Sequence, residues 1–355
     1  MSRRFLHIDD NQRRLESMSQ TASIKDVATH AQVAVGTVSN VLNYPDRVSQ
    51  RTKERVLKSI AELGFVRNDA ARQLRAGQSR TIGLIVLDVG NPFFSSVARA
   101  AEDAATALGS VVLVGDSGQD ASREAHYMDL FQEQRVQGLL ISPVGDVADR
   151  IDTLRERGVP TVLVDQLADT DRCSSVSVDD QEGGYLAARH LLDTGRRRLA
   201  FVGTPSIRQV ANRLSGAQRA VAEAAGATIE VLDSAGQTVL AGRQVGNDLV
   251  ERAPGERPEA VFCSNDLLAL GVMQSLTMLR TVKIPEDIAL IGYDDIDFAV
   301  SAVVPLSSIR QPTEALGRTA IELLAEEQES GGTKHRAVVF TPELVVRQST
   351  AGSPN

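Results

Sequence analysis

Polar side chains stand at the ends of apolar runs in this chain, with a regularity that could build a site for a small ligand. Asp88 follows TIGLIVL, Asp165 ends TVLVD, and Arg213 begins the helical pattern after LAFVG. Carboxylates and amides exchange hydrogen bonds with vicinal hydroxyl groups, a guanidinium group spans two oxygen atoms, and an aromatic face covers the apolar side of a sugar ring. The residues predicted to contact such a ligand are Asp88, Asn91, Phe93, Phe94, Asp116, Ser142, Asp165, Arg213, Asn265 and Asp294.

Each of these residues also has a structural alternative. A carboxylate after a strand is often the N-cap of the next helix, and Asn91 before Pro92 fits a turn. Phe93 and Phe94 could lie in a hydrophobic core as readily as against a ligand. The prediction therefore depends on the set as a whole.

Nothing in the sequence arranges these groups for catalysis. No GxGxxG follows a strand, and the chain has no GxxxxGKS or GxxxxGKT phosphate loop, no GxSxG elbow and no HExxH. The five histidines are scattered along 355 residues, and Cys173 and Cys263 do not form a metal-ligand cluster. We therefore expect a binding protein with no catalytic residue, no cofactor and no metal ion.

The elements that would position this site alternate between strands and helices. Near-continuous Val, Ile and Leu in the apolar runs indicates strands buried on both faces, and helical patterns separate them. The predicted strands are TIGLIVL, SVVLVG, GLLIS, TVLVD, LAFVG, TIEVL, AVFCS and IALIGY, and the predicted helices cover 93–108, 121–135, 181–193, 208–225, 238–251, 265–279 and 313–326. The order predicts an α/β core of two doubly wound lobes, in which ligands bind beyond the carboxyl ends of the strands.

Residues 23–43 predict an all-α helix-turn-helix near the N-terminus. Apolar residues recur at helical spacing in both of its short helices, and Ser23 with Asp26 forms a capping-box pattern at the start of the first. An ordinary helical hairpin is the structural alternative. The outward residues of the second helix are small or short hydrogen-bonding groups that a DNA major groove can admit, namely Val35, Gly36, Thr37, Ser39 and Asn40.

A third helix follows from about Ser49 and ends at Gly64. The next segment, RNDAARQLRAGQSRTIGLIV, is basic and Ala-rich and leads into the first strand of the core. This succession of headpiece, hinge and core resembles the lactose-repressor/galactose-repressor family of bacterial transcription regulators. The resemblance covers nearly everything from about Ser23 to Ser349.

The resemblance implies a homodimer that binds a pseudo-palindromic operator and changes its affinity when a small molecule occupies the core. It also implies a core similar to periplasmic sugar-binding proteins, with chain crossings between the lobes near 178–180, 309–311 and 340–341. Arg213, Asp165, Asn265 and Asp294 match family positions that touch ligand, and Leu74 matches the leucine that wedges into the minor groove. The DNA-contacting residues predicted in full are Val35, Gly36, Thr37, Ser39, Asn40, Arg72, Leu74 and Arg75.

The predicted reading helix departs from the usual family pattern. Val35 and Gly36 occupy positions at which relatives carry larger base-contacting groups, so direct readout should be modest. Asn40 becomes the best remaining base contact, and Thr37 and Ser39 are expected on phosphate.

The domain organisation follows from these assignments. We expect a disordered tail over 1–20, the helix-turn-helix domain over 21–66, a hinge over 67–80, the effector-binding and dimerisation core over 81–349, and a tail over 350–355. Lobe 1 covers about 81–178 and 310–340, and lobe 2 covers about 179–309 and 341–349.

The charge distribution supports a DNA-binding segment independently of the family. Residues 21–80 hold ten Lys and Arg against five Asp and Glu, whereas residues 81–355 hold 24 against 38. DNA affinity depends on where cations meet phosphates, so the net charge of −8 does not exclude it.

The composition also indicates the cellular compartment of the protein. No apolar run is long enough to span a membrane, residues 1–20 lack the apolar region of a signal peptide, and two cysteines indicate a reducing compartment. We expect a cytoplasmic, nucleoid-associated repressor that responds to a sugar or sugar derivative. A purine-type corepressor sensor is the alternative, and a periplasmic-type solute-binding protein is a remote one.

Overall fold

The computed structural model describes residues 22–65, 80–168, 171–278 and 282–351. The chain divides into two compact units between Gln78 and Ser79. Most of the predicted hinge, including Arg72, Leu74 and Arg75, and the predicted tail over 1–20 lie outside the described residues.

The N-terminal unit is a small helical domain around a buried apolar core of Val27, Val38 and Val56. At its start the Ser23 hydroxyl accepts from the Asp26 amide at 3.3 Å, and the Ser23 amide donates to the Asp26 carboxylate at 2.8 Å, so the predicted capping box is confirmed. Its helices are α2 (Ile24–His30), α3 (Val35–Asn43), the 3-10 turn η1 (Pro45–Arg47) and α4 (Gln50–Leu63).

Two backbone positions shape this unit. Gln32, between α2 and α3, has a φ of 51°, which reverses the chain within one tight turn. Gly64 ends α4 in the left-handed conformation with a φ of 59°, as its position after the last apolar residue predicted. The predicted helix-turn-helix with a third helix is therefore confirmed.

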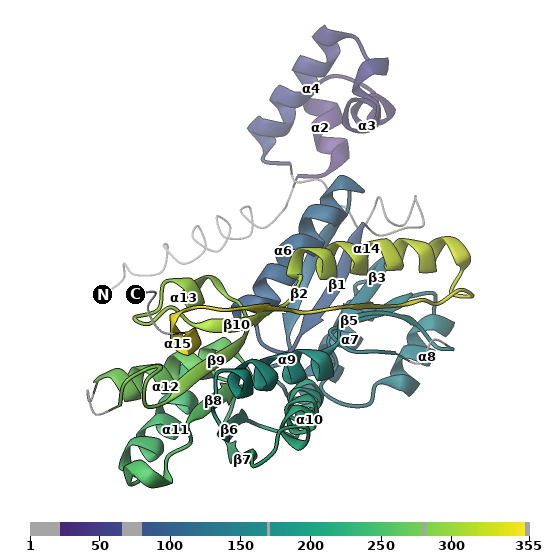
Figure 1. Cartoon of the computed structure of the whole chain (residues 1–355). Helices are drawn as coiled ribbons and strands as arrows, with labels where there is room; N and C mark the ends of the chain where they lie inside the picture. The colour runs from purple at the N-terminus through teal and green to yellow at the C-terminus, as the bar shows by residue number, and fades with distance from the viewer. Residues whose placement is uncertain (1–21, 66–79, 169–170, 279–281, 352–355) are drawn as a thin grey trace, which may run out of the picture. The chain divides into compact units, whose positions relative to one another are not determined.

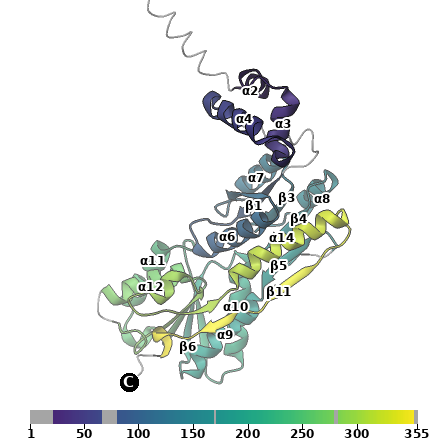
Figure 2. The ribbon, with the colours of Figure 1, turned by 90° about the horizontal axis from the view of Figure 1, so that it is seen from above.

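Lobe 1 is built on a parallel six-stranded sheet with helices on both faces (Figure 1). Helices α6 and α14 lie side by side over one face and bury the apolar cluster that includes Phe93 and Leu316 (Figure 2). The strands are β1 (Thr81–Val86), β2 (Val111–Asp116), β3 (Gly138–Ile141), β4 (Thr161–Val164), β5 (Ser174–Val178) and β11 (Ala337–Phe340), in the order β11-β5-β4-β3-β1-β2. The helices are α6 (Pro92–Ala107), α7 (Ala121–Glu133), α8 (Ala148–Glu156) and α14 (Thr313–Ser330).

Lobe 2 repeats this design. Its sheet is parallel except for β12, which pairs antiparallel with β10. The strands are β6 (Arg198–Gly203), β7 (Thr228–Asp233), β8 (Ala260–Cys263), β9 (Ala289–Asp294), β10 (Ser307–Arg310) and β12 (Glu343–Val345), in the order β12-β10-β9-β8-β6-β7. The helices are α9 (Asp180–Asp193), α10 (Arg208–Ala222), α11 (Val239–Glu251), η2 (Pro254–Glu256), α12 (Asp266–Met278), α13 (Asp297–Val300) and α15 (Gln348–Ala351).

The chain passes between the two sheets three times, after β5, after β10 and after β11. Two doubly wound lobes are therefore present, as predicted from the alternation of strands and helices. Helix α8 was not among the predicted helices, because its apolar face consists of little more than Ile151 and Leu154. Helix α15 extends two residues past the predicted end of the core, since Ser349 and Thr350 are buried against lobe 2.

Candidate functional site

Two glycines bring helices α9 and α10 into backbone contact. A Cβ atom on Gly184 would lie 1.9 Å from the carbonyl oxygen of Arg213, and one on Gly216 would lie 1.8 Å from that of Gln181. Any larger residue at either position would push the helices apart. The close approach fixes the backbone of α10 at Arg213, which lies at the centre of a buried polar network.

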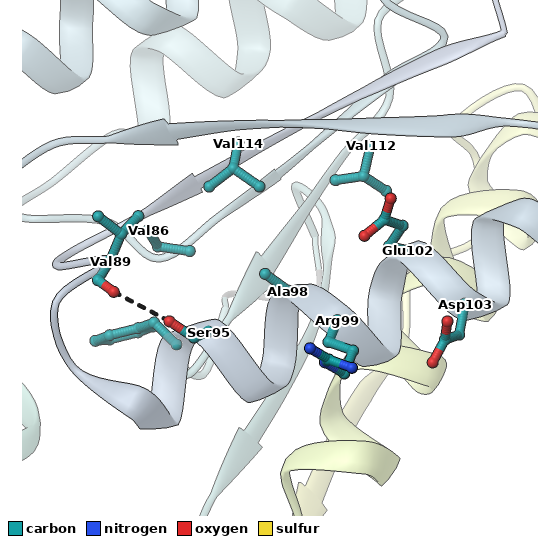
Figure 3. A pocket seen from close by; sticks show the side chains of 10 residues that line it. Val86, Val89, Ser95, Ala98, Arg99, Glu102, Asp103, Val112 and Val114 are labelled. Carbon is teal, nitrogen blue, oxygen red and sulfur yellow. Dashed lines mark hydrogen bonds between the residues drawn. The ribbon is translucent and has the colours of Figure 1, made fainter.

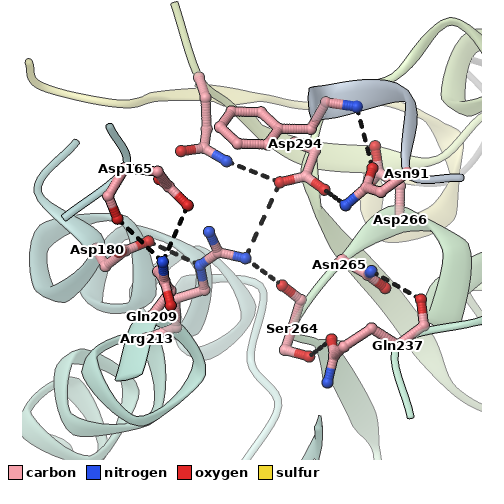
Figure 4. A network of polar contacts seen from close by, with 12 residues as sticks. Asn91, Asp165, Asp180, Gln209, Arg213, Gln237, Ser264, Asn265, Asp266 and Asp294 are labelled. Atoms are coloured by element: carbon pink, nitrogen blue, oxygen red, sulfur yellow. Dashed lines mark hydrogen bonds and ion pairs between the residues drawn. The ribbon is translucent and has the colours of Figure 1, made fainter. Parts of the chain in front are cut away.

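The Arg213 side chain is held on all sides by lobe 2 (Figure 4). Its Nε donates to Oδ1 of Asp180 at 2.8 Å, and its Nη1 donates to the carbonyl oxygen of Ser264 at 2.6 Å. The same Nη1 lies 3.9 Å from Oδ1 of Asp294. The guanidinium carbon stands 3.7 Å from the ring centre of Tyr293, within cation–π distance. Arg213 is therefore pre-aligned by an ion pair, a carbonyl and an aromatic face.

Side chains of this network join the two lobes directly. Gln209, one turn before Arg213, donates to both the carboxylate and the carbonyl oxygen of Asp165 at the end of β4, at 3.1 and 3.0 Å. Asn91, the N-cap of α6, donates to Asp294 at 3.3 Å, and Gln311 donates to the same carboxylate at 2.7 Å. Lobe 1 thus contacts lobe 2 through amide–carboxylate hydrogen bonds.

The carboxylates of the network are costly to ionise. Burial, together with the nearby Asp180 charge, raises the pKa of Asp165 well above its usual range, and burial also raises the pKa of Asp180 against the pull of Arg213. Burial raises the pKa of Asp294 to about 6, although Arg213 and the two amide donors oppose it. Burial alone would lower the pKa of Arg213, but the surrounding carboxylates, Asp180 foremost, raise it, so the guanidinium stays charged.

The backbone is strained at the same places. Asp165 has a φ of 61°, Asp294 a φ of 106° and Asp295 a φ of 54°, all in the region that side-chain-bearing residues seldom adopt. Such conformations persist where the surrounding structure enforces them, and they concentrate at ligand sites. The carboxyl ends of β4 and β9 therefore carry aspartates that are buried, lie close to other carboxylates and have a strained backbone.

The structure brings five of the predicted effector residues into this network. They are Asn91, Asp165, Arg213, Asn265 and Asp294. Asn265 has a local structural role as well, because its side chain caps α12 through the Leu268 amide at 2.9 Å and donates to the Gln237 carbonyl at 3.0 Å.

The other predicted residues are placed elsewhere. Asp88 and Asp116 accept hydrogen bonds from Gly90 and Gly118 at 2.7 and 3.0 Å, which are local turns after β1 and β2. Ser142 is fully buried at the end of β3, and its hydroxyl has no partner among the described residues. Phe93 and Phe94 are 3% and 7% exposed and pack against the core of lobe 1, while the Phe93 amide donates to the side-chain oxygen of Asn91 at 3.0 Å, so their contact with a ligand stays a prediction. They face the core because α6 presents its apolar face to the sheet.

Several network residues were not predicted from the sequence, among them Asp180, Gln209, Gln311 and Tyr293. Asp180 and Gln311 lie at chain crossings between the lobes, so their positions were a usable signal. Gln209 lies four residues before Arg213, on the same face of α10. Tyr293 is the last residue before Asp294 on β9 and reads as a core aromatic in an apolar strand.

A separate hollow of about 510 Å³ lies between α6 and β2, away from this network (Figure 3). Its walls combine apolar side chains of the edge strand with charged side chains of α6. They include Val112 and Val114 on β2 and Arg99, Glu102 and Asp103 on α6. Beside it Val111 and Leu113 are 55% and 47% exposed, which is unusual for apolar residues of a strand.

In the N-terminal unit, α3 exposes the residues predicted to face DNA. Val35 is 40% exposed, Gly36 and Asn40 are exposed, and Thr37 and Ser39 are half-buried. A Cβ atom on Gly36 would meet nothing within 4 Å, so packing in this unit does not require glycine there. At the C-terminal end of the helix the guanidinium carbon of Arg47 lies 4.8 Å from the ring centre of Tyr44.

Comparison with known proteins matches both units. Residues 23–68 match the family described as bacterial regulatory proteins, lacI family, and residues 188–350 match the periplasmic binding protein-like domain. The HTH-type transcriptional repressor PurR of Aliivibrio fischeri is 32% identical over 336 residues, which cover 93% of this chain and 98% of that protein.

Solved structures of regulators from the same family also match the chain. The lac repressor dimer bound to operator and the anti-inducer ONPF matches with a TM-score of 0.77 and 27% identity, over 93% of this chain and 99% of that one. A LacI family transcriptional regulator from Enterococcus faecium with bound ribose matches with a TM-score of 0.68 and 28% identity, over 77% of this chain and 100% of that one. Within the part of the chain that the structure describes, no helix has the length and apolar character needed to cross a membrane.

Proposed function

The chain belongs to the lacI family of bacterial regulatory proteins, and from this premise we propose that it is a dimeric repressor whose operator affinity is set by a small effector bound between the lobes of its core. The inter-lobe network around Arg213 carries the effector half of this proposal. It joins the lobes through side chains that a polar ligand could replace, so occupancy would favour one lobe arrangement and shift operator affinity by differential binding.

The chemistry of this network favours a sugar or sugar derivative. Asp165, Asp294 and Asn91 offer carboxylate and amide groups that match vicinal hydroxyls, and Arg213 can span two oxygen atoms. The ribose-bound relative is in keeping with this choice.

A purine-type corepressor is the second candidate, because the PurR repressors are similar over nearly the whole chain. A purine ring needs an aromatic or apolar face to stack on. In the described network the face of Tyr293 is covered by Arg213, and Phe93 and Phe94 are buried in lobe 1. The site as described therefore suits hydroxyl groups better than a flat base.

The DNA contacts are proposed to come from α3. Asn40 is the side chain best suited to read a base edge, and Thr37 and Ser39 are proposed to contact phosphate. The exposed, small Val35 and Gly36 would leave the helix close to the groove floor. Arg72, Leu74 and Arg75 keep their proposed roles in the hinge and the minor groove.

Dimerisation is proposed to use the apolar edge of lobe 1. Among the described residues β2 is the edge strand of its sheet; it exposes Val111, Leu113 and Val114, and Val114 lines the hollow described above. An unprotected apolar edge strand is a site of association. Leu113→Asp should therefore shift the dimer toward monomer in analytical ultracentrifugation.

We propose further that the protein acts by binding, without catalysis, cofactor or metal ion, in the cytoplasm where operator DNA is located. The test is in vitro selection of DNA from a random library by the full-length chain. Enrichment of an inverted repeat supports the proposal, and loss of binding to that repeat or gain of it on adding a sugar identifies an effector. If no sequence is enriched over the unselected library, the proposed function is wrong.

A further inference from the structure

The inter-lobe network holds more negative than positive charge. Three carboxylates, Asp165, Asp180 and Asp294, surround one guanidinium group, that of Arg213. All four side chains belong to residues no more than 6% exposed. In a buried setting these charges are weakly screened, so the sign of a ligand's charge matters.

Two nitrogen atoms of the guanidinium group already donate hydrogen bonds within lobe 2. Arg213 Nε is bound to Asp180, Nη1 to the Ser264 carbonyl, and its face lies on Tyr293. An incoming anion would have to compete with these partners for Arg213 while approaching the remaining carboxylates. Arg213 is therefore poorly placed to serve as an anion receptor.

Two buried acceptor atoms of the network lack a partner among the described residues, and so does the Nε2 donor of Gln237. Oδ1 of Asp165 and Oε1 of Gln311 have no hydrogen-bond partner among the described residues, and the two residues are 4% and 3% exposed. A buried acceptor without a donor is costly, and a ligand that supplies the donor recovers that cost. Both atoms call for an O–H or N–H group.

We propose that this site selects uncharged or amine-bearing ligands rich in hydrogen-bond donors and rejects their phosphorylated or carboxylated forms. The proposal rests on the proposed effector function and adds the charge class of the effector. The raised pKa of Asp165, caused by burial and by Asp180, fits the same view, because a further negative charge beside it would be opposed.

The selection places the effector in a reaction sequence. Phosphoryl transfer to a hydroxyl group of the effector would add negative charge to it and remove it from recognition. A kinase acting on the effector would therefore end the signal, and a phosphatase or hydrolase that releases the neutral molecule would begin it.

The first test compares matched ligands on the full-length protein by thermal shift and titration calorimetry. The pairs are D-ribose with D-ribose 5-phosphate, D-glucose and D-glucosamine with D-glucose 6-phosphate and D-gluconate, and inosine with inosine monophosphate. Like charges brought together in a binding site oppose binding, so the anionic member should bind on the order of 100-fold more weakly than its parent. Tighter binding of any anionic member than of its uncharged parent overturns the proposal.

The second test needs no ligand. Asp165→Asn keeps the acceptor for Gln209 and tolerates the φ of 61°, but removes one buried ionisable carboxyl group. The melting temperature of the free variant should rise at pH 8, whereas Asp233→Asn, at the exposed end of β7, should leave it unchanged. A fall in melting temperature for Asp165→Asn would show that the charge is matched and would overturn the proposal.

Operator binding is measured on the same preparations, so that the two proposals fail separately. Absence of operator binding contradicts the repressor function but leaves the charge selection to be judged by the ligand pairs and by the free variant. Conversely, an operator response to a phosphorylated sugar with higher affinity than to the free sugar supports the repressor function and contradicts the charge selection.

Discussion

Replacing Arg213 with Ala should cost the core about 3–5 kcal/mol of folding free energy, because it leaves two buried carboxylates without their counter-ion. Asp180 and Asp294 lie 2.8 and 3.9 Å from the guanidinium nitrogens, and the three side chains are 7%, 6% and 3% exposed for Arg213, Asp180 and Asp294. Removing one member of a buried pair is expensive because the other charge stays desolvated. Loss of the contact with Tyr293 adds to the cost.

The chain offers a matched control in Arg219→Ala. Arg219 lies on the same helix, pairs with Glu182 on α9 at 2.9 Å and stands 4.5 Å from the ring centre of Tyr185. The chemistry is the same, but the Arg219 and Glu182 side chains are 48% and 38% exposed. An exposed pair contributes about 0–1 kcal/mol, so this variant should remain close to wild type.

The assay is urea unfolding of the full-length protein at pH 7 and pH 5. In Arg213→Ala the unpaired carboxylates can relieve their burial by taking up protons, so the loss should be smaller at pH 5. A loss of the size seen for Arg219→Ala, or an equal loss at both pH values, would refute the argument that buried charge dominates. Effector-free operator binding by the fraction that remains folded should change little.

Other expected outcomes follow from single contacts. The pKa of Asp294 is raised from 3.8 to about 6 in the folded protein, so protonation of this carboxyl group stabilises the fold fully below pH 3.8, and that stabilisation is lost as the pH rises through 6. The free energy of unfolding should therefore decline between pH 4 and 7, and Asp294→Asn should remove up to about 3 kcal/mol of that decline in denaturation curves. Gly184→Ala should cost at least about 1–3 kcal/mol in urea unfolding, while Gly145→Ala, with open space around it, should be neutral. Ser23→Ala should lower the stability of the N-terminal unit by about 1 kcal/mol in hydrogen exchange. Asn40→Ala should weaken operator binding by about 1–3 kcal/mol in fluorescence anisotropy and relax the preference at one base pair.

Much of the fold could be predicted from the sequence because its signals are local. An unbroken run such as TIGLIVL needs burial on both faces and therefore a parallel sheet. Ser23 and Asp26 fix the start of α2 through their capping hydrogen bonds, and Gly64 ends α4 through its left-handed backbone conformation. Helix α8 was missed because its short apolar face gives a weak periodic signal.

The site was predicted only in part, because its members meet through tertiary contacts. The strand ends predicted that Asp165 and Asp294 would lie near one another, since parallel strands place their carboxyl ends at one edge, and both belong to the network. Asp180 and Gln311 belong to the network because the chain crosses between lobes beside them, a consequence of topology. Phe93 and Phe94 were predicted as ligand contacts from their residue type, and the periodicity of α6 packs them with Val97 against the core, the alternative that the sequence left open.

The network contains contacts within lobe 2 and contacts between the lobes, and this difference explains how ligand binding can be coupled to the arrangement of the lobes. Arg213 is fixed within lobe 2 by Asp180 and by the α9–α10 contact, so it need not move when a ligand binds. The bonds between lobes are of another kind, since Gln209 and Asn91 donate neutral amide hydrogens across the interface at 3.0–3.3 Å. A ligand hydroxyl can replace such a donor at little net cost, because hydrogen bonds of similar strength are exchanged. The free energy that separates lobe arrangements is then set by how well the ligand's donors fit both sides, which is the differential binding that allosteric control requires.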